Sequence, residues 1–391
     1  MKKFKICHIG WANSIHVERW LKWFSKKGHE MHLITDIPKE IEGVKIYNIN
    51  ERFSNKSRLE RYKECHFNFQ SKPLYNLNRI FKIRNIVKEI SPDIVHTHSL
   101  WYPGYLGVYL NFHPYVITVF NGDVLWKKDR LSLFEKLRTK LALRKSDLVT
   151  GVSNELVNAA LKHGAKNGCV IRRGVDLKKF KAGKDKETVR KELTLPLDKK
   201  IILSPRNIGD FYNLKTIVEI VPDIISKYKD VLFVFIWHSP EEGTDLKTLA
   251  CKLGVMGSIK FIGKVSHDQV ALYHKSADVM ISISDKDSGP VALQEAMAAG
   301  GVPVISDLVC VRELVNDGEN GFLVNPKDKN QIVIAVLKLL QDDDLRNKMK
   351  EYNLKIAIDK CDEEKEMEKM ERLYYKLTGE YQDDRYPRDD N

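Results

Sequence analysis

The chain has 391 residues, which is enough for two domains of ordinary size. Its 43% apolar and 30% charged residues are typical of a folded globular protein, and no apolar run approaches the ~20 residues that span a bilayer. The net charge of +12 comes from 65 basic and 53 acidic residues.

The first half of the chain alternates short apolar runs with helical stretches, which predicts a parallel sheet covered by helices. Helices are expected at Ile15–Lys27 and Arg79–Ile90, among others. The opening M-K-K-F-K-I-C-H-I-G has too short an apolar stretch for a signal peptide. We predict strands at Phe4–Ile9, Met31–Thr35, Ile94–Thr97, Tyr115–Phe120, Asp147–Val152 and Cys169–Ile171.

A basic segment, Arg52–Lys88, carries ten Lys or Arg and only two Glu, with aromatic residues between them. Such a surface can rest on anionic lipid headgroups, it can bind nucleic acid, or it can be a plain solvated face. No nucleic-acid motif accompanies it, so we predict no nucleic-acid partner.

Polar residues follow the predicted strands of the first half, where residues of a parallel sheet meet ligands. Gly10–Ser14 links the first strand to the first helix. S-P-D-I-V-H-T-H-S, Ser91–Ser99, places His98 just past a strand. T-V-F-N-G-D, Thr118–Asp123, places Asp123 past the next one. A histidine there can hydrogen-bond a hydroxyl group or can simply be buried, and a carboxylate can position a substrate or act as a base.

A charged segment, Lys178–Lys191, interrupts the apolar periodicity, and we expect it to connect two domains. Residues 362–379 read as a helix that ends at Gly379. Six scattered cysteines without a C-x-x-C pair argue against a zinc site or disulfide framework and indicate a reducing cytosol. The strand pattern restarts at Lys200–Ser204, Val231–Trp237, Ile259–Gly263, Val279–Ser284, Val302–Ile305 and Phe322–Val324.

The most informative stretch is Asp287–Ile305, which reads D-S-G-P-V-A-L-Q-E-A-M-A-A-G-G-V-P-V-I. A helix is expected to begin near Pro290, because proline suits a first helical turn. One acid, Asp287, lies on the loop, and another, Glu295, lies inside the helix. The helix N-terminus between them can hold an anion through its free N–H groups.

This stretch resembles the donor-binding signature of glycosyltransferase family 4, whose members are retaining and use nucleotide sugars. That signature is Glu, seven residues, Glu, then A-M-A-x-G-x-P-V. Here Glu295 is the second acid and Asp287 replaces the first. V-R-E-L-V and N-D-G-E-N-G-F-L-V follow in the expected order. The alternative is an ordinary strand–loop–helix–strand unit with a helix of small residues packed on the sheet.

The resemblance implies an α/β protein of GT-B architecture, with two doubly wound, Rossmann-like parallel-sheet domains that face each other across a cleft. Residues 1–180 would form the acceptor-side domain and residues 181–361 the domain that binds the nucleotide sugar. Residues 362–381 would form a helix that crosses back onto the first domain, and residues 382–391 a flexible tail.

The resemblance also implies the roles of single residues. Glu295 would bind ribose hydroxyls, Asp287 hydroxyls of the transferred sugar, and Arg206 the leaving diphosphate. His98 and Asp123 complete the predicted catalytic set. The predicted donor-binding residues are Gly10, Arg206, Lys215, Gly263, Lys264, Ser288, Gly289, Pro290, Val291 and Glu295.

The sequence departs from the family pattern at two positions. Phe120 occupies the place of a histidine that touches the donor sugar in many relatives. Phe211 occupies the place of a lysine that grips the diphosphate, for which Lys215 is a possible substitute. The D-x-D at Asp285–Asp287 lies inside a different motif from the metal-binding D-x-D of the other large glycosyltransferase fold, so we expect no metal or other cofactor.

The function expected is transfer of a sugar from a nucleotide-diphosphate sugar, most often a UDP-sugar in such families, to a glycan or lipid-linked acceptor. The protein would be cytoplasmic and could be peripheral on the cytosolic membrane face through residues 52–88. Two alternatives are a non-catalytic scaffold of the same fold, favoured by the absent lysine, and a sugar-nucleotide epimerase, which the A-M-A-x-G-x-P-V signature disfavours.

Overall fold

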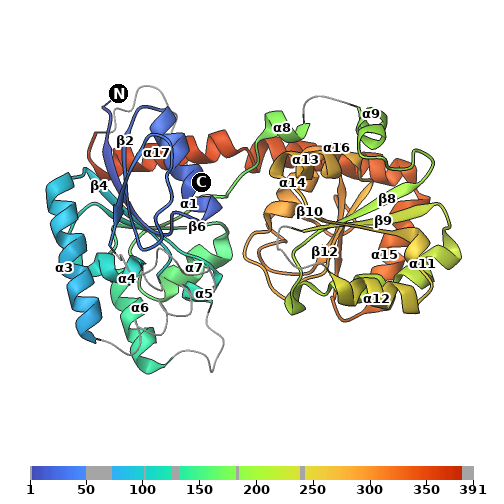
Figure 1. The fold of residues 1–391 in the computed structure, drawn as a ribbon, viewed down its shortest axis with the longest axis horizontal. Coiled ribbons are helices and arrows are strands. Elements are labelled where there is room, and N and C mark those ends of the chain that lie inside the picture. Colours follow the sequence, from blue (N-terminus) through green and yellow to red (C-terminus); the bar gives the residue numbers. More distant parts are fainter. Residues whose placement is uncertain are drawn as a thin grey trace. The chain divides into compact units, whose positions relative to one another are not determined.

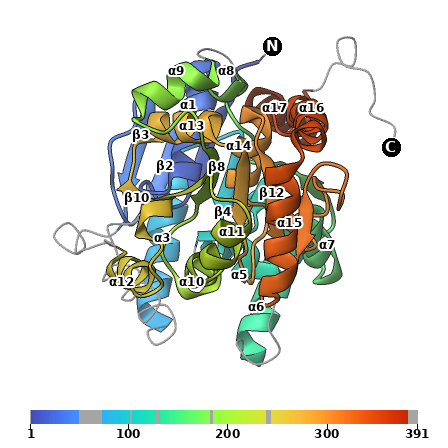
Figure 2. The ribbon, with the colours of Figure 1, turned by 90° about the vertical axis from the view of Figure 1, so that its right-hand side faces the viewer.

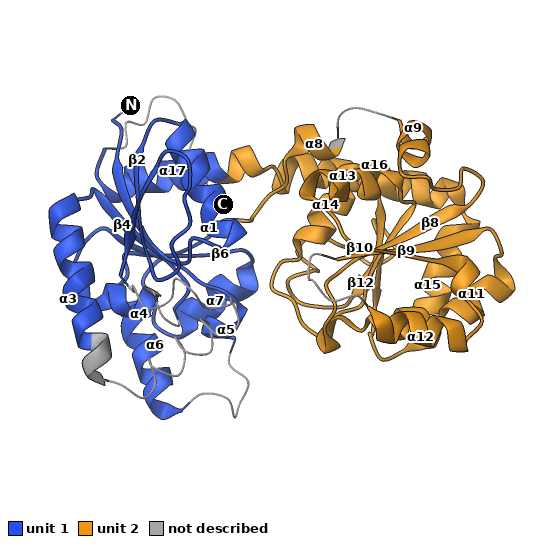
Figure 3. Cartoon of the chain, viewed as in Figure 1, with its two compact units in different colours: residues 1–171, 367–391 blue, residues 172–366 orange. Residues whose placement is uncertain are grey.

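The computed structural model describes residues 2–49, 73–100, 103–125, 132–181, 185–237 and 243–380. The chain divides into two compact units (Figure 3). Unit 1 comprises Met1–Ile171 and Met367–Asn391, and unit 2 comprises Arg172–Glu366. Each unit contains one parallel sheet with helices on both faces, so the predicted α/β fold with two parallel sheets is confirmed (Figure 1).

The sheet of unit 1 has seven described strands in the order β3-β2-β1-β4-β5-β6-β7, and every neighbouring pair is parallel. The strand order reverses between β1 and β4. The strands are β1 Lys5–Ile9, β2 Glu30–Thr35, β3 Val44–Asn48, β4 Ile94–His98, β5 Tyr115–Thr118, β6 Leu148–Gly151 and β7 Gly168–Val170. The helices are α1 Ile15–Lys26, α3 Pro73–Ile90, α4 Pro103–Gly107, α5 Asn121–Val124, α6 Leu133–Lys145 and α7 Asn154–Lys162, with a 3₁₀ turn, η2, at Val108–Leu110.

The sheet of unit 2 has six described strands in the order β10-β9-β8-β11-β12-β13, again all parallel. The strands are β8 Lys200–Pro205, β9 Val231–Trp237, β10 Ile259–Lys264, β11 Val279–Ser282, β12 Val302–Ser306 and β13 Phe322–Val324. The helices are α8 Leu177–Lys181, α9 Lys186–Glu192, α10 Leu214–Glu219, α11 Val221–Lys227, α12 Thr244–Lys252, α13 His267–Ser276, α14 Val291–Ala299, α15 Lys329–Gln341 and α16 Asp343–Lys360. Short 3₁₀ turns lie at η3 Asp210–Tyr212 and η4 Met256–Ser258.

Two hydrophobic cores flank each sheet, because successive side chains of a strand point to opposite faces. In β9, Phe233 and Phe235 join the core under α10, α11, α12 and α15. The alternate residues Leu232 and Val234 join the core under α13 and α14. Figure 2 shows α11 and α15 side by side over one of these faces. Strands buried on both faces read as continuous apolar runs, which explains why the sequence located β8 to β13.

Helix α17, Glu363–Leu377, begins in unit 2 and continues into unit 1. Met367, Met370 and Tyr374 are buried in the unit 1 core with residues of β1 and α1. The Tyr374 hydroxyl lies 2.5 Å from Nδ1 of His96 on β4. The end of the chain therefore completes the core of the unit that the beginning of the chain builds.

The structure corrects several sequence predictions. Strand β3 was not predicted, because V-K-I-Y-N is a half-exposed edge strand with a lysine in it. Strand β5 ends at Thr118 rather than Phe120, and unit 1 ends its first segment at Ile171 rather than at residue 180. The charged segment Lys178–Lys191 contains part of α8 and most of α9 rather than a simple connection. The tail at 382–391 lies outside the described residues.

Helix α9 belongs to unit 2 because its charged residues are anchored there. The Arg190 guanidinium donates to Asp278 at 2.7 Å and to the Ser276 carbonyl at 3.0 Å, and Arg190 is buried. The Lys186 ammonium donates to the other oxygen of Asp278 at 2.8 Å. Charge alone therefore misidentified this segment as solvated, because its cations have a buried partner 88 positions away.

Candidate active site

The candidate site in unit 2 lies where its strand order reverses, between β8 and β11. Ligands of open α/β sheets bind beyond the carboxyl ends of the strands at such a point. Arg206 comes directly after β8, and Asp287 lies on the loop between β11 and α14. The two residues are 81 positions apart in the chain, and the sheet brings them together.

Arg206 is buried and held on several sides. Its Nη2 forms an ion pair with Asp287 and donates to the Ser284 hydroxyl at 3.3 Å. Its guanidinium lies over the Tyr212 ring, 4.8 Å from the ring centroid. Its Nε is buried and has no hydrogen-bond partner among the described residues. A guanidinium fixed in this way keeps a donor for a ligand oxygen, and its planar fork suits phosphate.

Helix α14 begins at Val291, with Pro290 at the N-cap position rather than inside the first turn as predicted. Pro290 has no side-chain acceptor, so no side chain caps the first turn. Gly289 has a φ of 135°, which favours glycine, and the N–H of Ser288 donates to Asp287 at 2.7 Å. The N-terminal end of α14 therefore stands next to the acid that pairs with Arg206.

Glu295 lies within α14 and is largely buried. Its Oε2 is 3.4 Å from Nε2 of His274, which comes from α13. His274 is buried, and this nitrogen makes no hydrogen bond within the described part of the chain. The sequence prediction missed His274, because a histidine in an ordinary amphipathic helix carries no motif.

An aromatic pair occupies the place where the family pattern has a lysine. The Phe211 and Tyr212 rings are 4.1 Å apart, and Phe211 is 37% exposed. The Lys286 ammonium lies 4.9 Å from the centroid of the Phe211 ring. The backbone N–H of Asp285 donates to the Phe211 carbonyl at 2.8 Å, which ties the two loops together. Burial raises the pKa of Tyr212, and Arg206 opposes that rise.

Three other predicted donor residues lie away from Arg206 in their contacts. Lys215 is exposed on α10, and its ammonium is 4.0 Å from Asp245, so its role stays a prediction. Gly263 has a φ of 83° at a bulge in β10, and the Trp237 indole lies beside it, 3.6 Å from where a Cβ would be. Lys264 ends the same strand and is exposed.

In unit 1, the predicted residues also lie past the strands at the reversal of the strand order. Asp123 is buried, and its carboxylate accepts from the Phe120 N–H at 2.7 Å and from the Ser99 hydroxyl at 3.0 Å. It therefore joins the loops after β4 and β5. Gly10, after β1, lies against His98: a Cβ at Gly10 would be 3.6 Å from the His98 Cβ.

His98 belongs to a buried group of three histidines with His8 and His96. Nδ1 of His8 is 2.8 Å from Nε2 of His98, and the two ring planes are 15° apart, so the rings are joined edge to edge. Burial lowers the pKa of His98 to about 3. Burial, followed by the neighbouring imidazoles, lowers the pKa values of His8 and His96 well below the ordinary value. All three rings are therefore neutral at pH 7.

The three histidines place one nitrogen each within 4.8 Å of the others, a spacing that can hold a metal ion. Their hydrogen bonds oppose this use. The nitrogens of His96 contact the Tyr374 and Thr118 hydroxyls at 2.5 and 2.7 Å, and one nitrogen each of His8 and His98 is used in their mutual bond. Metal binding would have to break these buried bonds, so the group fits a structural hydrogen-bond network better.

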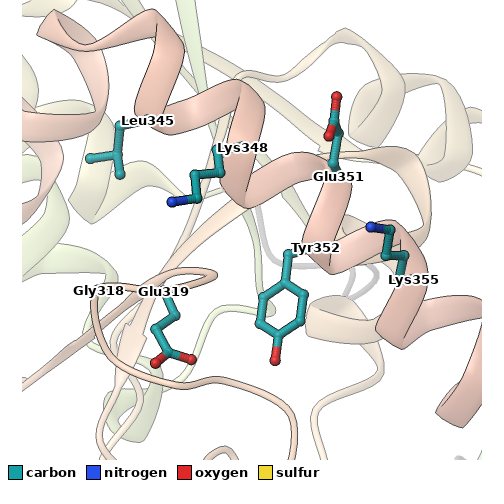
Figure 4. A pocket seen from close by; sticks show the side chains of 7 residues that line it. All are labelled: Gly318, Glu319, Leu345, Lys348, Glu351, Tyr352 and Lys355. Atoms are coloured by element: carbon teal, nitrogen blue, oxygen red, sulfur yellow. The ribbon is translucent and has the colours of Figure 1, made fainter.

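A separate hollow of about 570 Å³ lies between α16 and the loop that contains Gly318 (Figure 4). Lys348 and Lys355 line it together with Glu319 and Glu351, so its charges balance. None of the predicted site residues lines this hollow.

Comparison with known proteins identifies the class of this site. The family model described as Glycosyltransferase Family 4 matches residues 14–179, and the model described as Glycosyl transferases group 1 matches residues 185–356. The chain belongs to glycosyltransferase family 4. It is thus a glycosyltransferase of the GT-B type, and the Asp287–Ile305 stretch lies in the part matched by the second model.

This family 4 glycosyltransferase has relatives of nearly its own length. It is 26% identical to N-acetyl-alpha-D-glucosaminyl L-malate synthase of Bacillus anthracis, over 90% of this chain and 91% of the relative. It is 28% identical to an uncharacterized glycosyltransferase of Methanocaldococcus jannaschii, over 88% of this chain and 89% of the relative.

Solved structures show the same fold. The sucrose-phosphate synthase of Thermosynechococcus elongatus superposes with a TM-score of 0.77 at 17% identity, over 97% of this chain and all of the other. HepE of Anabaena, in complex with UDP and glucose, superposes with a TM-score of 0.74 at 15% identity, over 96% of this chain and all of the other.

Proposed function

We propose that this glycosyltransferase is a retaining enzyme that moves a sugar from a nucleotide-diphosphate sugar, with UDP as the first candidate nucleotide, to a glycan or lipid-linked acceptor. The observation that carries the proposal is Arg206, buried at the point where the strand order reverses and next to the N-terminus of α14. Negative charge develops on the leaving diphosphate, and donors fixed in advance stabilise that charge.

Each predicted donor residue has a role in this proposal. Glu295 binds the ribose hydroxyls and Asp287 binds hydroxyls of the transferred sugar. Arg206 and the backbone N–H groups of Ser288, Gly289 and Val291 bind the diphosphate, with Pro290 fixing the entry to the helix. Without donor, Asp287 pairs with Arg206. The diphosphate would share that guanidinium and free the carboxylate for the sugar.

The remaining predicted residues serve the base and the acceptor. Gly263 and Lys264 meet the base, and Gly10 lies under the phosphate. Asp123 and His98 position the acceptor side, because the Asp123 carboxylate already holds two loop groups and His98 is held by His8. The proposed mechanism is front-face attack without an enzyme nucleophile, and it requires no metal.

The proposed setting is synthesis of cell-surface polysaccharide or glycoconjugate at the cytosolic face of a membrane. In the described part of the chain, no helix is both long and apolar enough to cross a bilayer. The basic stretch 52–88 lies outside the residues with described side chains up to residue 76. Within the rest, Lys82, Arg84 and Lys88 are exposed, whereas Arg79 is buried and paired with Asp36.

The test is thermal stabilisation by UDP, GDP, ADP and CMP, each with a chelator and with magnesium, on the wild type and on Glu295→Ala. A nucleotide at about 100 times its dissociation constant adds ~2.7 kcal/mol to the stability of the unit that binds it. We expect a shift with one nucleotide that does not depend on the chelator and that Glu295→Ala abolishes. Glu351→Ala, on α16 beside the balanced hollow, is the matched control and keeps the shift.

Absence of a shift with every nucleotide would contradict the donor site and favour a non-catalytic scaffold. A shift that survives in Glu295→Ala would remove Glu295 from the ribose role. Conversion of a sugar nucleotide without any acceptor would indicate an epimerase. Once the base is known, a donor and acceptor screen that includes small hydroxy acids follows, since the name of the Bacillus anthracis relative contains L-malate.

A further inference from the structure

Helix α6 of unit 1 exposes an apolar face. Leu133, Phe134, Leu137 and Leu141 are between 42% and 74% exposed, while Ala142 and Leu143 are buried on another side of the helix. At 3.6 residues per turn, the four exposed side chains fall within an arc of about 100°. The helix therefore has two apolar faces, one packed on the core of unit 1 and one directed to solvent.

Basic residues border the exposed apolar face of α6. On a helical wheel, Lys136, Lys140 and Arg144 lie along one edge and Arg138 lies near the other. The helix contains five Lys or Arg and a single Glu, which is Glu135. An apolar stripe with cationic borders is typical of a helix that lies in the interface of an anionic bilayer.

Helix α3 adds the same kind of surface nearby. Leu77 and Phe81 are exposed on it, with the exposed Lys82 and Arg84 beside them. Both α3 and α6 pack on α4 and η2, so the two helices belong to one region of unit 1. In both ribbon views, α6 lies at the lower end of unit 1 (Figures 1 and 2).

We propose that the exposed face of α6, with the Leu77–Arg84 part of α3, docks this protein on an anionic lipid bilayer. This deepens the membrane part of the proposed function, which had rested on residues 52–88. The cationic borders choose this occupant, because each basic residue near the surface adds about 1 kcal/mol to binding on anionic lipid. The apolar side chains then enter the acyl boundary.

The test is flotation of the full chain with vesicles of phosphatidylcholine, or of an equimolar mixture of phosphatidylcholine and phosphatidylglycerol. We expect binding to the mixed vesicles only. Lys136→Gln with Lys140→Gln weakens it roughly 25-fold, about fivefold per charge. Leu133→Ser with Phe134→Ser and Leu137→Ser abolishes it. Ile334→Ser, at an exposed apolar residue of α15, is the matched control and changes nothing.

Two results would overturn the docking surface. One is wild-type binding of the serine variant to mixed vesicles. The other is a wild-type dimer that the serine variant dissociates while vesicle binding persists, since the face would then join two copies of the chain. The nucleotide shift of both variants stays at the wild-type value, so failure of this surface is distinct from failure of the donor site.

A different observation concerns the diphosphate. Among the described residues, no carboxylate forms a salt bridge with Lys286, whereas Arg206 is already paired with Asp287. Lys286 lies over Phe211, Phe211 contacts Tyr212, and Tyr212 lies under Arg206. Two cations thus flank one aromatic pair, and the second of them lies beside the ring that occupies the place of the usual lysine.

The geometry points to Lys286 as the second cation of the diphosphate site, in place of the lysine absent at 211. This inference rests on the proposed function. We expect Lys286→Ala to weaken UDP binding about tenfold and to leave uridine binding unchanged, because only UDP carries the phosphates. Phe211→Lys in the Lys286→Ala background restores UDP binding. Lys215→Ala, the matched control, leaves it unchanged.

The outcomes separate the two proposals. If the wild type binds UDP and Lys286→Ala binds it equally well, Lys286 has no part in the diphosphate site. If Lys286→Ala loses UDP and uridine to the same extent, its effect is not on the phosphates. If the wild type binds another of the four nucleotides instead, the same variants are compared on that nucleotide and its nucleoside.

Discussion

We expect Arg206→Ala to lower kcat for sugar transfer by about 10²- to 10³-fold, the usual loss when one preorganised donor to a developing anion is removed. Arg206 is the buried cation at the reversal of the strand order, and its Nε keeps an unused N–H. Arg206→Lys keeps the charge but not the planar fork, so we expect an intermediate loss. Steady-state kinetics and binding of UDP and uridine measure the effect.

The control for Arg206 separates catalysis from folding. Removing one partner of a buried ion pair destabilises a protein, here by leaving Asp287 without its guanidinium. The unfolding midpoint of each variant is therefore measured beside its kinetics, and Lys215→Ala serves as a cation control from the same loop region. Equal losses of UDP and uridine binding in Arg206→Ala would remove this residue from the phosphate site.

The second large effect is an acid instability of unit 1. The pKa values of His8, His96 and His98 are lowered in the folded chain, that of His98 to about 3, whereas unfolded histidine titrates near 6.5. Between these limits the unfolded chain binds protons that the folded chain does not, so stability falls as the pH falls. Each histidine contributes a slope of about 1.4 kcal/mol per pH unit.

Hydrogen exchange of the amides in β1 and β4, measured from pH 6.5 to 4.5, tests this slope within unit 1. His8→Gln and His96→Gln each lower the number of protons taken up on unfolding by about one. His113→Gln, at an exposed histidine, is the control and leaves the slope unchanged. A wild-type stability that is flat across this window would contradict the neutral buried state of the three rings.

The fold could be predicted where local patterns decide it. Continuous apolar runs located all the strands of the second sheet, because those strands are buried on both faces. Val44–Asn48 escaped because an edge strand pairs on one side only and tolerates exposed polar residues. Helix α9 escaped because the partner of its Arg190, Asp278, is distant in the sequence.

The candidate site divides in the same way. The Asp287–Ile305 motif is local, so the loop and helix that carry Asp287 and Glu295 could be predicted from it. The pairing of Asp287 with Arg206, the approach of Glu295 to His274, and the position of Lys286 over Phe211 depend on which strands and helices become neighbours. No spacing along the chain contains that information.

Helix α17 has a consequence for biosynthesis. Residues up to Ile171 leave the ribosome first, yet their core includes Met370 and Tyr374, which are made last. At about 5–20 residues per second, translation of the whole of unit 2 intervenes, which takes on the order of ten seconds or more. The first unit to be synthesised is therefore the second to be finished, and until then its Tyr374-binding surface is available to chaperones.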